Sequence, residues 1–170
     1  AVQTYSAVNN PTSGGEIDGL YILGNTFTHF GTGTWGYEGI YINTDAGDPS
    51  PGGVVWIDSN VFEGDILRAI TTERSNFSIT NNLINTDLAP SDLSSGPGAY
   101  QGINVLATSD GEIQHTTING FWQQVNNSGG ALNLSDLFAD EAYNTFDKFA
   151  YASSGTAIYS SVQDAIDDAS

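Results

Sequence analysis

The sequence predicts an all-β fold in which short parallel strands wind into a solenoid of stacked coils, a parallel β-helix. A phrase made of a β-branched or apolar run, an Asn and a further apolar residue recurs at intervals of about 20 to 35 residues. No strand-like segment is joined to the next by the helical pattern of about 10–15 residues that alternates with strands in a βαβ fold. Signals for tight hairpins are nearly absent, and Asn119-Gly120 is the single Asn-Gly step. Parallel strands joined by turns therefore fit best.

The recurring phrase places an Asn at a bend between two short strands. The phrases contain Asn25-Thr-Phe27, Asn60-Val-Phe62, Asn82-Leu-Ile84, Asn119-Gly-Phe121 and a degenerate Asn144-Thr-Phe146. Asn tolerates left-handed backbone geometry and bonds its own backbone, which suits a bend after a strand. We expect stacking to bring Asn25, Asn60, Asn82 and Asn119 together, so that their amides hydrogen bond from coil to coil.

Alternating or β-branched runs predict the strands, and Gly-, Pro- and Ser-rich stretches predict loops extruded from the stack. The predicted strands are Ile17–Leu23, Glu38–Asn43, Val54–Ile57, Ile66–Thr71, Phe77–Thr80, Gly102–Ala107, Ile113–Ile118 and Ala131–Leu134. The predicted loops are Thr28–Tyr37, Thr44–Gly53, Thr86–Tyr100 and Gln123–Gly130. Loops on a rigid scaffold are the usual place for recognition.

The composition is strongly acidic, with three Lys and Arg against twenty Asp and Glu and a formal net charge of −17. A surface with so few cations repels phosphate backbones, which excludes nucleic acid as a partner. It also disfavours anionic membranes and highly acidic polysaccharides. The absence of Cys excludes disulfides and thiolate metal sites. No apolar run approaches the length of about 18 residues that spans a bilayer, so we expect no membrane insertion.

The last segment is the one convincing helix. Residues 158–170 carry Ser160 or Ser161 as an N-cap, and the predicted apolar face consists of Val162, Ala165, Ile166 and Ala169. The segment Tyr159-Ser-Ser-Val-Gln-Asp-Ala-Ile-Asp-Asp-Ala169 resembles the capping helix of right-handed parallel β-helices of the pectate-lyase-like superfamily. The Asn-Thr-Phe phrases resemble the body of that superfamily. The resemblance implies one domain, with β-helix coils over 1–157 and a short C-terminal capping helix over 158–170, of a kind found in tandem in large extracellular and surface proteins.

Many members of the superfamily cut or epimerise polysaccharides, so an enzyme is one alternative. Asn43-Thr-Asp45 and Asn85-Thr-Asp87 match one motif of polygalacturonase-type hydrolases, but both are also ordinary turn sequences, and the remaining motifs are missing. Neither His29 nor His115 is flanked by glycines. Lyase-type elimination requires an Arg or Lys base, and the chain offers only Arg68, Arg74 and Lys148. Arg68 and Arg74 are better read as local ion pairs. We therefore assign no catalytic residue.

Two sets of residues are candidates for binding. Trp35, Tyr37, Tyr41 and Tyr100 lie in or beside the predicted loops, where aromatic rings offer flat platforms for sugars or else pack onto the stack. Asp45, Asp48, Asp110 and Glu112 supply carboxylates in loops and are candidate ligands of a structural calcium ion, or else solvated turn residues. No other cofactor is expected. Asn76, Asn126 and Asn133 begin N-x-S sequons for N-linked glycosylation.

From the sequence we expect a non-catalytic structural or adhesive module of an extracellular or cell-surface protein. The expected partners are further copies of itself or neighbouring modules, stacked end to end into fibres, and polysaccharide. The alternatives are a polysaccharide-acting enzyme, namely a lyase, hydrolase or epimerase, and a carbohydrate-binding module without catalysis. Two carboxylates and a base converging in a groove on one face of the stack would favour the enzyme.

Overall fold

The computed structural model describes residues 19–28, 38–42, 54–73, 76–87, 100–107, 110–146, 157–159, 161–163 and 166. These residues contain strands and a short 3-10 helix. The first sheet contains β1 (Gly19–Leu23), β4 (Val54–Asp58), β7 (Phe77–Thr80) and β10 (Gly111–Gln114). The second contains β2 (Thr26–Thr28), β5 (Val61–Glu63), β8 (Leu83–Asn85), β11 (Thr117–Asn119) and β13 (Thr145–Phe146). The third contains β3 (Glu38–Ile42), β6 (Arg68–Thr72), β9 (Gln101–Val105), β12 (Gln123–Asn126) and β14 (Ala157–Tyr159). The 3-10 helix is η3 (Leu134–Phe138).

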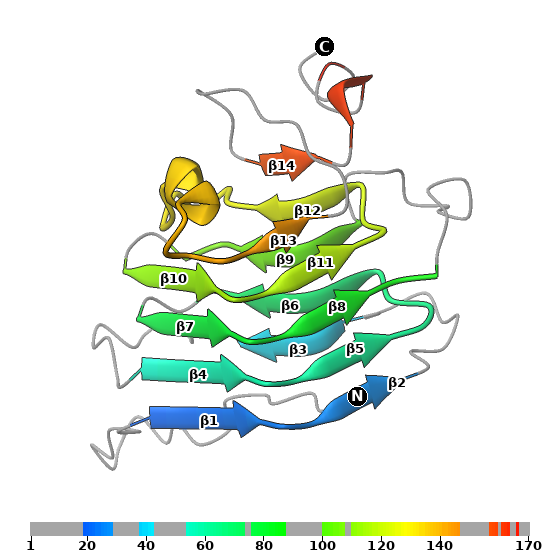
Figure 1. Ribbon diagram of the computed structural model, residues 1–170. Coiled ribbons are helices and arrows are strands. Elements are labelled where there is room, and N and C mark those ends of the chain that lie inside the picture. The colour runs from blue at the N-terminus through cyan, green and yellow to red at the C-terminus, as the bar shows by residue number, and fades with distance from the viewer. Residues whose placement is uncertain are drawn as a thin grey trace.

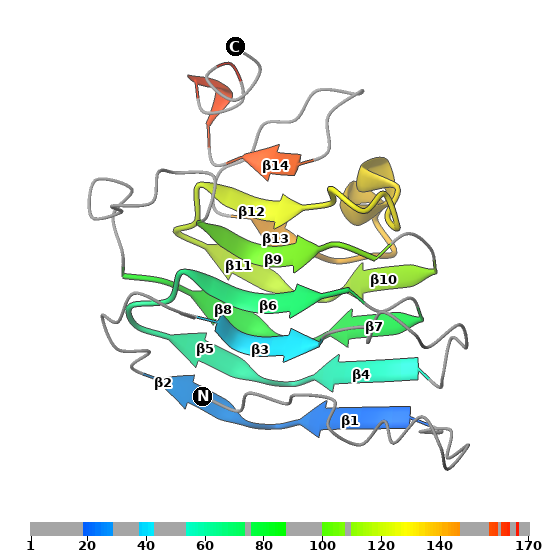
Figure 2. The same ribbon diagram turned by 180° about the vertical axis from the view of Figure 1, so that it is seen from behind.

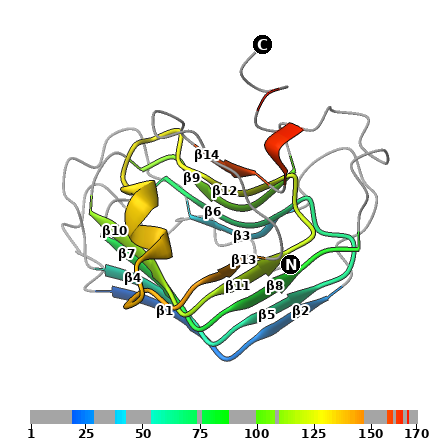
Figure 3. The same ribbon diagram turned by 45° about the horizontal axis from the view of Figure 1, so that its top comes forward.

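Consecutive strands belong to different sheets, which is the arrangement of a parallel β-helix (Figure 1). Each of the four coils from β1 to β12 contributes one strand to each sheet, and each of these strands pairs in parallel with its equivalent one coil away, as β1 does with β4. Seen obliquely from the C-terminal end, the first and second sheets form the two arms of a V and the third sheet lies opposite them (Figure 3). The predicted all-β, right-handed parallel β-helix is confirmed.

The space between the sheets is filled by columns of side chains that repeat from coil to coil. In the first sheet, Ile22, Ile57, Ile79 and Ile113 are in register, and all are at most 8% exposed. In the second sheet, the rings of Phe27 and Phe62 stack with centroids 4.7 Å apart. Burial of such aliphatic and aromatic columns removes a large apolar area from water. This continuous core holds the coils together along the axis.

The bend between the first and second sheets lies at the apex of the V (Figure 3). A column of polar side chains occupies this bend. The backbone N–H of Asn25 donates to Oδ1 of Asn60 at 2.9 Å, and that of Asn60 donates to Oδ1 of Asn82 at 3.0 Å. The backbone N–H of Asn82 in turn lies 3.4 Å from Oγ1 of Thr116, and that of Thr116 lies 3.0 Å from Oδ1 of Asn144. We call Asn25, Asn60, Asn82, Thr116 and Asn144 the corner column. The predicted contacts among Asn25, Asn60 and Asn82 are confirmed.

The predicted place of Asn119 in this column is wrong. Asn119 lies in β11, one strand beyond the bend, and its Nδ2 donates to Oδ1 of Asn85 in the neighbouring coil at 2.8 Å. Thr116 takes the corner position instead, because its hydroxyl also accepts a hydrogen bond from a neighbouring backbone N–H. The predicted strand Ile113–Ile118 is accordingly divided at the bend between β10 and β11.

The left-handed residue at each bend is the one that precedes the corner column, and not the corner Asn as expected. These residues have φ between 48° and 65° and are Gly24, Ser59, Asn81, His115 and Tyr143. Non-glycine residues seldom adopt this conformation. The same backbone conformation therefore recurs in five coils with five different residue types. The hydrogen bonds of the corner column, one position farther along, keep the bend in this conformation.

Two further element predictions are wrong. Residues 123–130 were expected to form a loop, but Gln123–Asn126 is β12. Its polar side chains pair with those of β9: Nε2 of Gln101 donates to Oε1 of Gln123 at 2.7 Å, and Nδ2 of Asn126 donates to Oδ1 of Asn104 at 2.9 Å. The predicted strand Ala131–Leu134 is replaced by a cap at Asn133 and by η3, which takes the place of a strand above β10 (Figure 1).

The C-terminal end closes the third sheet differently from the body. β14 pairs antiparallel with β12, as Figure 2 shows from behind, so Ile158 and Tyr159 are strand residues and do not belong to the predicted helical unit. Val162, Gln163 and Ile166 are helical, and Ser160, one of the two predicted caps, lies outside the described residues. Val162 and Ile166 are 66% and 53% exposed. The described part of the predicted apolar face is therefore turned toward solvent. No helix of the described residues is long and apolar enough to cross a bilayer.

Candidate functional site

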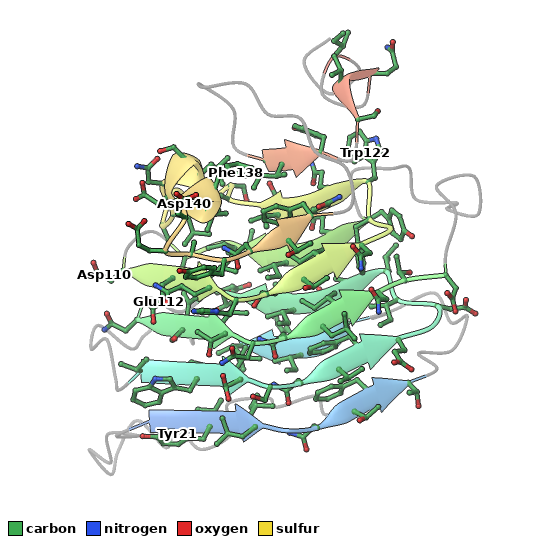
Figure 4. The ribbon with its side chains drawn as sticks, viewed as in Figure 1. Tyr21, Asp110, Glu112, Trp122, Phe138 and Asp140 are labelled. Atoms are coloured by element: carbon green, nitrogen blue, oxygen red, sulfur yellow. The ribbon has the colours of Figure 1, made fainter. Side chains whose placement is uncertain are left out.

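The outer face of the first sheet carries a column of side chains that differ from coil to coil. Residues alternate between the core and the surface along each strand, so the residue before each buried Ile faces outward. Tyr21, Trp56, Ser78 and Glu112 occupy this position and are in register across β1, β4, β7 and β10. We call these four residues the outer column. Figure 4 shows Tyr21 on β1 and Glu112 on β10, at opposite ends of the same sheet.

Two aromatic rings form one half of the outer column. The rings of Tyr21 and Trp56 are stacked, with centroids 4.5 Å apart and planes 9° from parallel. Tyr21 is 60% exposed, and Trp56 is partly exposed. Gly19 lies beside them, and a Cβ at this position would come within 2.9 Å of the Trp56 ring. The glycine therefore leaves room for the paired rings on the surface.

An open groove of about 450 Å³ lies next to Trp56, where the small side chain of Ser78 follows it in the column. Its lining residues are Val54, Trp56, Asn76, Phe77, Ser78, Asp110, Gly111 and Glu112. The volume is in the range of small-molecule sites, about 300–1,000 Å³. Tyr21 stacks on the indole from the side of β1, so the groove lies on the other side of Trp56, toward β7 and β10. An aromatic wall and a carboxylate wall thus face each other across Ser78.

The carboxylate wall is held in place by hydrogen bonds within the sheet. Oγ of Ser78 donates to Oε1 of Glu112 at 2.7 Å, and Nε2 of Gln114 lies 3.3 Å from Oε2. A carboxylate has about four lone-pair directions, so Glu112 keeps acceptor capacity for a ligand. Asp110 has a left-handed backbone at φ 57° and stands at the entrance to β10 (Figure 4).

A second acidic position lies one step farther along the same face. Oδ1 of Asp58 accepts hydrogen bonds from Oγ1 of Thr80 at 2.6 Å and from Nδ2 of Asn81 at 2.7 Å. Oγ of Ser59 donates to its other oxygen at 2.8 Å. These hydrogen bonds, that of Thr80 first, lower the pKa of Asp58 below its usual value of 3.8. Two of the donors, Ser59 and Asn81, are left-handed bend residues. The carboxylate of Asp58 therefore stabilises the bend, and its oxygens are engaged within the protein and not directed at a ligand.

The aromatic residues predicted as a sugar platform do not come together in the described structure. Trp35 and Tyr37 lie outside the described residues. Tyr41 is on β3 in the third sheet, where its hydroxyl donates to Oε1 of Glu73, and this hydrogen bond raises the pKa of Tyr41 to about 12. Tyr100 is fully buried and its ring packs on Phe121 with centroids 5.2 Å apart. Burial leaves the ring of Tyr100 no face for a ligand.

Two of the four predicted calcium ligands share the groove. Asp110 and Glu112 both line it, whereas Asp45 and Asp48 lie outside the described residues. The described part of the chain contains no group of three or more His, Asp or Glu side chains arranged to hold a metal ion. Two carboxylates alone do not make up the six to eight oxygen ligands that calcium takes.

No base faces the carboxylates of the groove. Its lining, made up of described residues, contains no Lys, Arg or His. Arg68 lies on β6 in the third sheet and is bound to Glu38 at 2.9 Å, while Arg74, Lys148 and His29 lie outside the described residues. His115 stands at a bend with its ring stacked on Tyr143, 5.1 Å between centroids. The combination of two carboxylates and a base that would favour an enzyme is thus incomplete at this groove.

Sequence reasoning missed Tyr21 and Trp56 as site residues. It treated Trp56 as an ordinary strand residue and looked for recognition on the loops. Aligning the phrases on their corner residues would have found both, because Tyr21 and Trp56 then fall at the same outward position as Ser78. No known protein family matches the chain, nor does any curated protein or solved structure.

Proposed function

We propose that the chain is a non-catalytic adhesive module of an extracellular or cell-surface protein, built on the fold of the pectate-lyase-like superfamily, that binds an uncharged polysaccharide. The observation that carries this proposal is the groove in which Trp56 faces Asp110 and Glu112 across Ser78. Aromatic rings take the apolar faces of sugar rings, and carboxylates accept hydrogen bonds from the hydroxyls. One sugar unit lies over Ser78, with its face on the indole.

The charge of the groove sets the class of glycan. The groove offers two carboxylates and no cation among its lining residues, and the whole chain carries a formal net charge of −17. A uronate or a sulfated sugar would meet like charge at this wall, which costs binding energy. A neutral sugar instead supplies hydroxyl donors to Asp110 and Glu112. The ligand is therefore an uncharged polymer.

Calorimetry or affinity electrophoresis against a panel of neutral and acidic polysaccharides tests the proposal. We expect binding to neutral members only, and Trp56→Ala to weaken it by about tenfold or more, which corresponds to about 1.4 kcal/mol. Tyr143→Ala is the matched control, because Tyr143 is also a stacked aromatic residue and is 67% exposed, but lies at a bend away from the groove. Equal loss of binding in both variants, or none in either, would refute the assignment of the groove.

The same material separates an adhesive module from an enzyme. A bound polysaccharide incubated with the protein, with and without calcium, keeps its chain length if the module is non-catalytic. Shortened chains, or the unsaturated ends that elimination produces, would instead establish a hydrolase or lyase. Glu112→Gln then shows whether the groove is responsible.

One further observation supports contact with a neighbouring module or a second copy at the C-terminal end. Val162 and Ile166 are separated by one helical turn and are both more than half exposed. An apolar helical face of this kind is normally covered. We expect Val162→Ser combined with Ile166→Ser to abolish any concentration-dependent rise in mass measured by light scattering. A strict monomer at high concentration would contradict end-to-end stacking.

A further inference from the structure

We propose that Asn76 is a site of N-linked glycosylation and that its sugar fills the groove beside Trp56. The glycosylation of Asn76 does not depend on what the groove binds. The proposal that the attached sugar blocks the groove rests on the proposed function. Asn76-Phe-Ser78 is an N-x-S sequon, and two of its three residues, Asn76 and Ser78, line the groove together with Trp56. The acceptor asparagine and the aromatic wall therefore lie at the same hollow.

The three sequons differ in how their asparagine is engaged. Nδ2 of Asn126 donates to Oδ1 of Asn104 at 2.9 Å inside a paired strand. Nδ2 of Asn133 donates to Oδ1 of Asp136 at 3.0 Å, and its Oδ1 caps η3 by accepting from the backbone of Ser135. Asn76 is partly exposed, and its side chain makes no hydrogen bond to any described residue. When the coils close, a sugar on Asn126 or Asn133 would therefore displace a side-chain hydrogen bond, whereas a sugar on Asn76 displaces none to a described residue.

The backbone at Asn76 directs its position. Asn76 has a left-handed φ of 60° and immediately precedes β7, so it stands at the edge of the first sheet. Its carbonyl accepts from the backbone N–H of Val55 at 2.9 Å, which ties the residue to the strand that carries Trp56. A sugar on Nδ2 therefore starts at the rim of the groove. The aromatic wall provides the surface on which it packs.

The modification must precede the closing of the coils. Ser78, the third residue of the sequon, is only 7% exposed in the folded chain, and its hydroxyl is bound to Glu112 from the next coil. A transferase that reads this hydroxyl reaches it only before β10 pairs with β7. In the reaction, Nδ2 of Asn76 bonds to the anomeric carbon of a sugar carried on a polyprenyl phosphate. The bond from that carbon to the phosphate oxygen breaks, the lipid phosphate leaves with the electron pair, and an amide proton passes to solvent.

The groove is therefore accessible to an external glycan in unmodified protein and blocked in protein glycosylated at Asn76. Unmodified protein presents Trp56 to an external glycan. Protein modified at Asn76 carries its own sugar in that place, which competes at a very high effective concentration because it is tethered. A glycan on Asn133 lies on the exposed turn before η3 and leaves Trp56 uncovered.

The test compares the full chain made in cells with and without an N-glycosylation pathway. Mass spectrometry of the modified protein is expected to find Asn76 occupied and Asn126 unoccupied. Acrylamide quenching of Trp56 fluorescence, taken as the difference on Trp56→Phe substitution, is expected to fall at least twofold on modification. Asn76→Gln from the same cells restores the quenching, and the matched control Asn133→Gln does not. An unoccupied Asn76 beside an occupied Asn133, or an occupied Asn76 with unchanged quenching, overturns the inference.

A binding measurement keeps this inference distinct from the proposed function. If unmodified protein binds no neutral polysaccharide, the proposed function is wrong. The occupancy of Asn76 and the quenching of Trp56 then still decide whether the attached sugar covers the groove. Unmodified protein that binds, with modified protein at least tenfold weaker, supports both. Modified protein that binds equally well, with Asn76 fully occupied, overturns the shielding of the groove alone.

Discussion

The corner column and the outer column run along the same coils but follow different rules. The corner column keeps one chemistry, an acceptor oxygen for the backbone N–H of the previous coil, through Asn60, Asn82 and Thr116. The outer column changes at every coil, from Tyr21 and Trp56 to Ser78 and Glu112. Both positions recur in each coil, but only the corner position keeps the same type of hydrogen-bonding group.

The two columns show which positions of a stacked fold maintain its architecture and which can vary and form a binding surface. A buried bend leaves backbone groups that must be bonded, so its residues are constrained in every coil. An outward position meets water and has no such requirement. Variation there places unlike side chains next to one another, and the groove at Trp56 is made of such neighbours.

The largest expected effect comes from breaking the corner column at its centre. Asn82 is 2% exposed; its Oδ1 accepts from the backbone and side-chain amides of Asn60, and its Nδ2 donates to the carbonyl of Ile57. Asn82→Ala leaves these buried groups unbonded, and we expect the free energy of unfolding in urea to fall by about 2 to 4 kcal/mol.

Asn25 provides the control at the end of the column. Asn25 is exposed, and its side chain makes one link to the next coil, from Nδ2 to Oδ1 of Asn60 at 3.2 Å, so Asn25→Ala should cost about 1 kcal/mol or less. Equal losses for Asn25→Ala and Asn82→Ala would mean that the column does not hold the coils.

Replacing Thr116, the one corner residue that is not Asn, should produce a smaller change in the free energy of unfolding, and of the opposite sign. Thr116 accepts from the backbone of Asn82 across 3.4 Å, which is longer than the 2.9 and 3.0 Å links below it. Thr116→Asn supplies the longer side chain found at the other corners. We expect it to raise the free energy of unfolding by about 0.5 to 1.5 kcal/mol. A loss of stability in the same urea titration would show that this corner is too tight for Asn.

The smallest expected effect concerns Asp58, which lies on β4 between the outer-column residue Trp56 and the corner residue Asn60. Asp58 binds Ser59, Thr80 and Asn81, and its pKa is lowered below 3.8. Its contribution to stability is therefore present above pH 3.8 and is lost as the pH falls through the pKa of the folded state. We expect thermal melting to show wild type more stable than Asp58→Asn near neutral pH, with the gap narrowing below pH 3.8. A gap independent of pH would exclude the charge of Asp58 as its source.

Much of the fold was predictable because its strongest signals are local. The phrase around Asn25, Asn60 and Asn82 combines a strand, a bend and a strand, and this pattern survives any choice of loops. Asn119 was misplaced because Asn also suits an outward ladder position, and only the register distinguishes the two. β12 was missed because Gln123 and Asn126 are polar in sequence, and their partners Gln101 and Asn104 lie 22 residues away.

The site was less predictable for the same reason. Asp110 and Glu112 were expected as ligands and do line the groove, but their aromatic partner lies two coils away. For Tyr100 the sequence left two possibilities open, a platform for sugars or packing onto the stack, and its ring is buried against Phe121. Propensity describes each strand, whereas a groove depends on which strands become neighbours.

The most direct test of the groove is NMR of the indole N–H signals of the three tryptophans, assigned by Trp→Phe substitution, during titration with a neutral oligosaccharide. Unmodified protein should show a saturable shift of the Trp56 signal, while that of Trp122 stays in place. Trp122 is 6% exposed and packs on Tyr159, so it serves as an internal control. A Trp56 signal that does not shift at any concentration would contradict binding at the groove.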